Sequence, residues 1–195
     1  MATPAAPADV WARVEAQALS CTRCRLCEQR NKVVFGSGHR SARVMFVGEA
    51  PGRNEDRQGL PFVGRAGELL EKILGAMGLR RDDVYITNVV KCWPPGNRGP
   101  EPDEVEACRG FLEQQIALID PEVIVALGRY AAVVLTGIEA PIGVLRGRVH
   151  DVDGRKLVAT YHPAACLRNE EYKRPVWDDM QVVMEILGLP NRRTK

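Results

Sequence analysis

Short apolar segments alternate with amphipathic helical patterns along this chain, and this alternation limits the folds available to it. Strand-like apolar segments lie at residues 44–47, 84–87, 122–127, 144–152 and 156–160. Helical patterns lie at residues 9–19, 65–77, 103–119, 128–135 and 178–187. Strands that alternate with helices are typical of an α/β fold. We therefore expect a three-layer α/β/α sandwich around a central, mainly parallel four-stranded sheet.

The length and composition fit one globular domain. At 195 residues the chain can bury a sizeable core. We expect residues 1–195 to form a single domain, with loose tails at residues 1–8 and 190–195. No apolar run approaches the roughly 20 residues that span a bilayer, and the N-terminus lacks a secretory signal pattern. These features predict a cytoplasmic monomer without a membrane partner.

The net charge of +2 is too small to indicate a nucleic-acid partner. The distribution of the charges along the chain is more informative. Between residues 21 and 43, one acid, Glu28, accompanies six basic residues: Arg23, Arg25, Arg30, Lys32, Arg40 and Arg43. A basic patch of this kind can contact phosphates. A solvated face of the protein is the simpler alternative.

Polar or turn-forming residues stand at four expected strand ends. These ends are Gly48-Glu49, Asn88, Gly128 and His162. In α/β sheets, ligands bind beyond the carboxyl ends of the strands. The first end continues into glycines, acids and one aromatic residue, through Gly52, Glu55 and Phe62. We interpret this stretch as one wall of a site, against the alternative of an idle surface loop.

Six cysteines occur, at positions 21, 24, 27, 92, 108 and 166. In a reducing compartment disulfides are not expected. Thiols that arrive from separate segments can hold zinc or an iron–sulfur cluster, and their spacing does not decide between the two metals. Alternatively, Cys92 and Cys108 are small buried apolar residues. Cys166 is expected to be free.

The segments GEAPGRNED, PFVG, TNVVKCWPP and HPAACLRN, together with the thiols, resemble the family 4 uracil-DNA glycosylases. The resemblance covers roughly residues 15–187. It implies a monofunctional DNA-repair hydrolase of base excision repair, associated with the nucleoid. This enzyme would flip uracil out of single- or double-stranded DNA and leave an abasic site. The implied cofactor is a [4Fe–4S] cluster on Cys21, Cys24, Cys92 and Cys108, with Cys27 outside the ligand set.

The resemblance also implies roles for individual residues. Phe62 would stack on the flipped uracil, Asn88 would read its edge, and His162 would stabilise the leaving group. Glu49 would orient or deprotonate the attacking water, and Glu55 would lie near uracil C5. A departure limits the Glu49 assignment: where the related family 1 enzymes carry a water-activating Asp, this chain has Ala50.

Further contacts are expected with the DNA backbone and stack. Gly48 and Gly52 would let the main chain approach sugar and phosphate closely. Leu167 or Arg168 would enter the gap left by the flipped base, from a loop at residues 164–169; an ordinary helix start is the competing interpretation.

Two other functions fit the same residues. One is a uracil-DNA binding protein that traps its ligand, although the segment between Cys92 and Cys108 contains no histidine. The other is a zinc-bound structural module for nucleic acid.

Overall fold

The computed structural model describes residues 8–190. The tails expected at residues 1–8 and 190–195 lie outside the described residues, apart from Ala8, which begins the first helix, and Pro190. No helix among the described residues is long and apolar enough to cross a membrane.

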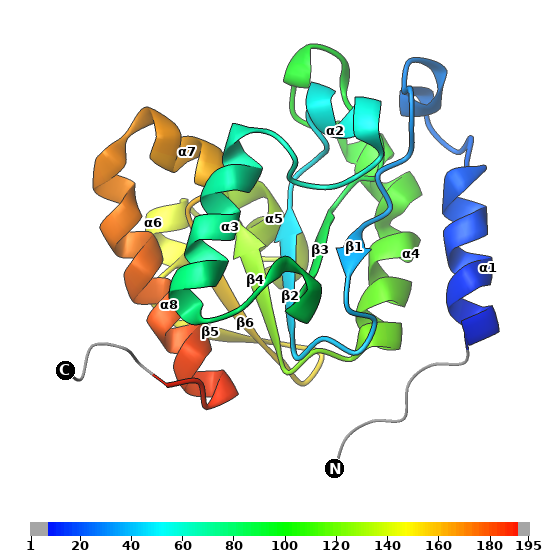
Figure 1. Ribbon diagram of the computed structural model, residues 1–195. Helices are drawn as coiled ribbons and strands as arrows, with labels where there is room; N and C mark the ends of the chain where they lie inside the picture. The colour runs from blue at the N-terminus through cyan, green and yellow to red at the C-terminus, as the bar shows by residue number, and fades with distance from the viewer. Residues whose placement is uncertain (1–7, 191–195) are drawn as a thin grey trace.

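The centre of the fold is a sheet with the strand order β1-β3-β2-β4-β6-β5 (Figure 1). The strands are β1 (Ser37–Gly38), β2 (Val44–Gly48), β3 (Tyr85–Asn88), β4 (Val123–Leu127), β5 (Val149–Val152) and β6 (Arg155–Thr160). The four inner strands are parallel to one another, and β1 and β5 pair antiparallel at the two edges. The α/β class and the parallel core are confirmed, but the sheet has six strands and not four.

Within residues 8–190, eight α-helices surround the sheet. They are α1 (Ala8–Leu19), α2 (Arg53–Gln58), α3 (Arg65–Met77), α4 (Pro102–Ile119), α5 (Arg129–Thr136), α6 (Ile142–Leu145), α7 (Pro163–Arg168) and α8 (Lys173–Leu187). The segment at residues 164–169 is therefore mainly helical, and the expected loop there is wrong. Residues 142–145 form a short helix and not the start of a strand, while α8 begins five residues before the predicted residue 178.

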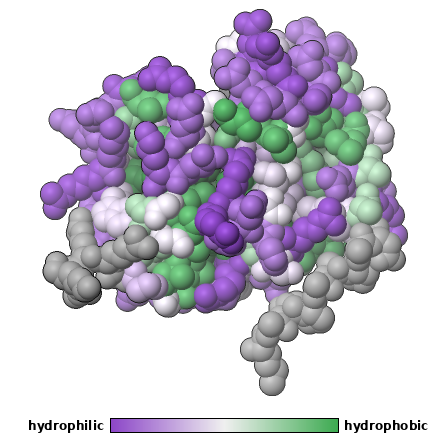
Figure 2. All heavy atoms as spheres, viewed as in Figure 1, coloured by the Kyte–Doolittle hydropathy of each residue, from purple (hydrophilic) through white to green (hydrophobic). Residues whose placement is uncertain are grey.

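Alternate residues of the strands pack on opposite sides of the sheet, as the two-residue period of a strand requires. Met45 and Val47 face a core that includes residues of α1, α4 and α5, whereas Val44 and Phe46 face residues of α3 and α8. Figure 1 shows α1 and α4 on one side and α3 and α8 on the other. On the face seen in Figure 2, hydrophilic residues cover most of the surface, and hydrophobic residues form small separate patches.

A buried carboxylate connects α8 to the end of β6. Asp179 is 1% exposed and accepts hydrogen bonds from Thr160 Oγ1 at 2.6 Å and from Arg146 Nε and Nη2 at 2.9 Å. Thr160 is the last residue of β6, two positions before His162. The ion pair therefore fixes the strand end from which His162 projects.

Asp179→Ala is expected to destabilise the fold by about 3 kcal/mol, because the largely buried Arg146 guanidinium then has no anionic partner. Chemical denaturation measures the change. Asp178→Ala is the matched control, since Asp178 is the exposed neighbour on the same helix. Equal stability losses in the two variants would contradict this account.

Candidate active site

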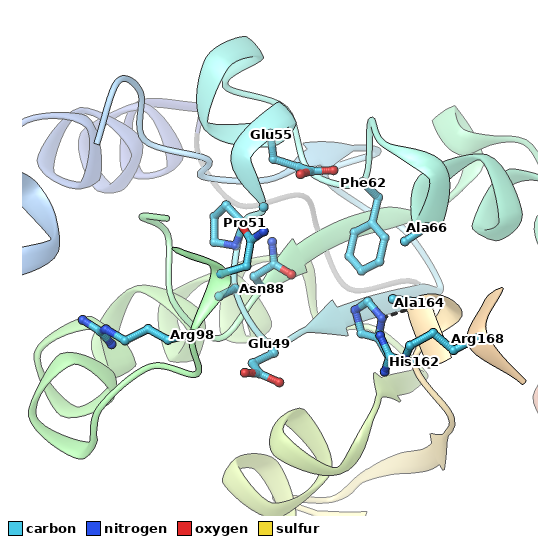
Figure 3. Close-up of a pocket in the computed structure, with 13 residues that line it drawn as sticks. Glu49, Pro51, Glu55, Phe62, Ala66, Asn88, Arg98, His162, Ala164 and Arg168 are labelled. Atoms are coloured by element: carbon cyan, nitrogen blue, oxygen red, sulfur yellow. Dashed lines mark hydrogen bonds between the residues drawn. The ribbon is translucent and has the colours of Figure 1, made fainter. Parts of the chain in front are cut away.

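Three strand ends meet at a cavity of about 510 Å³ (Figure 3). The ends of β2, β3 and β6 bring Glu49, Asn88 and His162 to its wall, and the segment between β2 and α3 adds Gly52, Glu55 and Phe62. Residues far apart in the sequence thus surround one space at the carboxyl edge of the sheet, where α/β folds bind ligands.

The remaining predicted residues lie around this cavity in different ways. Arg168 on α7 is part of its wall, whereas Leu167 does not line it and is 39% exposed. Gly48 packs directly against two residues of the wall. A Cβ there would overlap Asn88 Oδ1 and come within 2.8 Å of Phe62 Cζ. Gly128 packs against His162, where a Cβ would be 3.1 Å from His162 Cβ, and it does not line the cavity.

Asn88 presents an unused acceptor. Its side chain is 1% exposed, and its Oδ1 has no hydrogen-bond partner. A buried polar atom without a partner costs free energy and calls for an explanation. The Asn88 main-chain carbonyl accepts a hydrogen bond from Lys91 Nζ at 2.7 Å, so the residue itself is held in place. A ligand with an N–H group would satisfy Oδ1.

The His162 ring is set up as a hydrogen-bond donor. Its Nδ1 accepts a hydrogen bond from the Ala164 main-chain N–H at 3.1 Å, the dashed line in Figure 3. Burial, with a smaller effect from Arg168, lowers the pKa of His162 from 6.5 to about 4. The ring is therefore neutral near pH 7. Since Nδ1 accepts, the proton of the neutral ring lies on Nε2, which is then a donor.

Phe62 and His162 lie side by side in the cavity wall. Their ring centroids are 5.6 Å apart and their planes are inclined by 26°. Phe62 is 6% exposed and has a φ of 53°, which places a non-glycine residue in the left-handed region. A flat ring face is thus available next to Asn88, as Figure 3 shows.

The two acids of the predicted site differ in their surroundings. Burial raises the pKa of Glu49, whose Oε1 would lie 3.4 Å from a Cβ at Gly99. Glu55 instead uses Oε1 to accept hydrogen bonds from the main-chain N–H groups of Val63 and Gly64, at 2.9 Å and 3.0 Å. Glu55 therefore anchors the loop that carries Phe62.

Sequence reasoning missed Asn97 and Arg98, which both line the cavity. Figure 3 shows Arg98 on the side opposite Arg168. Arg98 donates to both oxygens of Glu104, at 2.6 Å and 2.8 Å. Glu104 is fully buried and also accepts from Arg25 Nε at 2.9 Å, and these partners lower its pKa to about 2. The position of Asn97 and Arg98 just after β3, in a segment rich in proline and glycine, was the available signal.

Five thiols line a second, much smaller cavity of about 20 Å³: Cys21, Cys24, Cys27, Cys92 and Cys108. They come from the segment after α1, the segment after β3, and α4. The rest of its wall consists of three apolar and three basic residues: Ala18, Ala107, Phe111, Arg23, Arg30 and Lys91. Cys166 lies apart, on α7, and all six cysteines are free of disulfides.

The thiol cavity suits sulfur ligands that carry negative charge. Arg30 Nη1 donates to Cys92 Sγ at 3.3 Å, and Arg23 Nε donates to Cys21 Sγ at 3.4 Å. Burial raises the pKa of Cys92 to about 11, so the thiolate needs a metal to form at neutral pH. Among residues 8–190, no three Cys, His, Asp or Glu side chains already stand at metal-binding distances. The donors fit a thiolate-bound metal group by their chemistry and convergence.

The fold and the cavity define an α/β protein with a cavity at the carboxyl edge of its mainly parallel sheet. The model of the uracil DNA glycosylase superfamily matches residues 35–181, so this chain belongs to that superfamily. It is 44% identical to the type-4 uracil-DNA glycosylase of Archaeoglobus fulgidus over 87% of this chain and 89% of the relative. It is 48% identical to the type-4 enzyme of Thermotoga maritima, over 83% and 86% respectively.

The lowered pKa of His162 makes stability depend on pH. Between pH 6.5 and about 4 the unfolded chain binds a proton at this residue that the folded chain does not bind. Its contribution to the free energy of unfolding is therefore complete above pH 6.5 and decreases as the pH falls toward 4. We expect the stability of the protein relative to His162→Gln to decline between pH 7.5 and pH 5.

Urea denaturation at several pH values measures this difference. The exposed His39, changed to Gln, reports what a surface histidine contributes under the same conditions. A stability difference between the protein and His162→Gln that stays constant over this range would show that His162 does not titrate as described.

Proposed function

We propose that this protein hydrolyses the N-glycosidic bond of uracil in DNA and leaves an abasic site. The observation that carries the proposal is the unpartnered, buried Oδ1 of Asn88 beside the Phe62 and His162 rings. The type-4 uracil-DNA glycosylases that resemble this chain over most of its length support the same reaction. The partner is uracil-containing DNA.

Recognition of uracil follows from the two ends of the Asn88 amide. Oδ1 accepts a hydrogen bond from uracil N3–H, and the NH₂ group donates to O4. Cytosine has an acceptor at N3 and a donor at C4, so it would leave these buried groups unpaired at a cost of about 1–3 kcal/mol each. The uracil must first leave the base stack, at a cost of a few kcal/mol. Stacking on Phe62 offsets roughly 1–3 kcal/mol of that cost.

Bond cleavage places negative charge on the departing uracil, chiefly at O2. The Nε2–H of neutral His162 donates a hydrogen bond to O2, and a preorganised donor of this kind is worth about 3 kcal/mol. The sugar becomes cationic, as in other glycosidic cleavages. Glu49 orients the water that attacks C1′ and accepts its proton while the bond between C1′ and N1 breaks. Its carboxylate also stabilises the cationic sugar.

The residues of α7 face the DNA in this proposal. Leu167 is exposed and apolar, which suits a side chain that fills the gap left by the flipped base. Arg168, in the cavity wall, is suited to a phosphate next to the uracil. Gly48 and Gly52 keep the floor of the site free of side chains.

We propose that Cys21, Cys24, Cys92 and Cys108 hold a [4Fe–4S] cluster. Bound there, the cluster supplies iron–thiolate bonds that join the segment after α1, the segment after β3 and helix α4. Hydrolysis of a glycosidic bond transfers no electron, so the role of these ligands is structural. Cys27 lines the same cavity, and its thiol is the one available competitor for iron.

Single-turnover excision from a uracil-containing oligonucleotide tests the reaction. Asn88→Ala and His162→Ala are each expected to lower the rate about 100-fold. His162→Ala removes one donor worth about 3 kcal/mol in the transition state, and Asn88→Ala removes two hydrogen bonds to uracil that are worth about 1–3 kcal/mol each. His150→Ala changes a histidine outside the cavity and should retain the rate. Full activity of both site variants would refute the assignment. A stable protein–DNA adduct on a denaturing gel would point to trapping instead.

Metal analysis tests the cofactor. Protein purified without oxygen should contain about four iron and four sulfide per chain and absorb visible light. Cys108→Ser should lose both iron and colour, while Cys166→Ser should keep them because Cys166 lies on α7, away from the thiol cavity. Zinc in place of iron would contradict the proposal, and loss of iron in Cys27→Ser would revise the ligand set.

A further inference from the structure

The Phe62 main chain has a conformation that an aromatic residue rarely adopts. Its φ is 53°, and the other described non-glycine residues with positive φ are two aspartates and one asparagine. Those residue types tolerate the left-handed region, whereas a bulky side chain is strained there. The surroundings of Phe62 must therefore supply contacts that keep this conformation.

Two charged side chains hold the main chain around Phe62 from opposite ends. Arg81 donates from Nη1 to the Phe62 carbonyl at 3.0 Å and from Nη2 to the Pro61 carbonyl. Glu55 accepts from the N–H groups of Val63 and Gly64. Consecutive peptide groups from Pro61 to Gly64 are thus fixed by side chains that belong to other parts of the fold.

Arg81 reaches this loop from outside the cavity. It begins the 3₁₀ turn Arg81–Asp83 before β3 and does not line the cavity. Its side chain is 23% exposed, with Glu71 as an ion partner at 3.7 Å and Ser37 Oγ at 3.5 Å. The shortest hydrogen bonds of this partly buried guanidinium go to main-chain carbonyls. A guanidinium has two parallel N–H donors that can reach adjacent carbonyls at once, and a lysine ammonium lacks this planar fork.

The loop that carries Phe62 also packs closely against helix α3, at the Phe62 carbonyl oxygen. A Cβ at Gly67, in the first turn of α3, would overlap the Phe62 carbonyl oxygen. The Phe62 carbonyl therefore lies between the α3 backbone and the Arg81 guanidinium. With the carbonyl fixed on one side and the following N–H groups fixed by Glu55, the direction of the Phe62 Cα–Cβ bond is set, and this bond determines where the ring can lie.

We propose that Arg81 is a positioning residue for uracil recognition: it holds the Pro61 and Phe62 carbonyls so that the Phe62 ring presents its face to the flipped base. The inference rests on the proposed function, because it assumes that Phe62 stacks on uracil. Arg81 itself touches neither the base nor the reacting atoms. Its effect on excision passes through Phe62.

A double-mutant cycle tests whether Arg81 affects excision through Phe62. Arg81→Ala is expected to lower single-turnover excision roughly 5- to 150-fold, the range that base stacking on an aromatic ring provides. Phe62→Ala should lower it by a similar factor, and the double variant should lose no more than Phe62→Ala alone. Arg80→Ala is the matched control for charge, since Arg80 is the exposed neighbour, paired with Asp83. It should retain the rate.

Chemical rescue separates positioning from a general loss of stability. Guanidinium at a low, non-denaturing concentration should restore part of the excision by Arg81→Ala, whereas methylammonium should not, because it lacks the planar fork. Neither cation should restore Phe62→Ala. If Arg81→Ala does not fold, Arg81→Lys replaces it: this variant keeps the charge but cannot hold both carbonyls, and we expect it to lose excision without losing its melting temperature.

Three results would overturn the inference. These are an unchanged rate in Arg81→Ala or Arg81→Lys, a double variant whose loss is the product of the two single losses, and equal rescue by both cations. Each of these results is compared with the excision rate of the unaltered protein. If the unaltered protein does not excise uracil, the proposed function fails instead, so the two failures are distinguishable.

Discussion

The parallel pairing of Gly48 with Asn88, at the ends of β2 and β3, is the contact on which the cavity depends. It sets the asparagine amide directly beside a residue without a side chain, and both Asn88 Oδ1 and the Phe62 ring occupy the space above that glycine. Any side chain at residue 48 would displace the amide or the ring. The strand register and the missing Cβ together let the Asn88 amide and the Phe62 ring stand side by side in the cavity wall.

The parallel core could be predicted because each inner strand is a short apolar run, buried on both faces, between amphipathic helices. The edges could be predicted only in part. β1 has only two residues, Ser37 and Gly38, and neither is typical of a strand. The segment is a strand only because it pairs with β3, which its own sequence does not reveal. A strand was expected at residues 144–152, and β5 occupies residues 149–152 of it. The start of the expected strand belongs instead to the helix α6, Ile142–Leu145. Four residues are too few to show a helical period, so the sequence pattern could not reveal this helix.

Residues at strand ends could be proposed for the site because the fold class places those ends together. Glu55 was named as a site residue from the resemblance, but its hydrogen bonds to the main chain, and the contribution of Arg81 altogether, could not be found in this way. Arg81 and Glu55 act on main-chain groups, and nothing in the sequence around Phe62 reveals its positive φ. Arg98 lies in the proline- and glycine-rich segment after β3, which the sequence does show, but its place in the cavity wall depends on tertiary contacts such as its ion pair with Glu104. Tertiary contacts of these kinds leave no periodic pattern in the chain.

Glu104 connects the wall of the larger cavity with the segment that carries the first three cysteines. One buried carboxylate is shared by Arg25, in the cysteine-bearing segment, and by Arg98, in the cavity wall. If one arginine loses its contact with Glu104, the other arginine is left as the main partner of the buried carboxylate. Because both guanidiniums pair with the same carboxylate, a change that removes its charge deprives the cysteine-bearing segment and the cavity wall of one shared anionic partner at once.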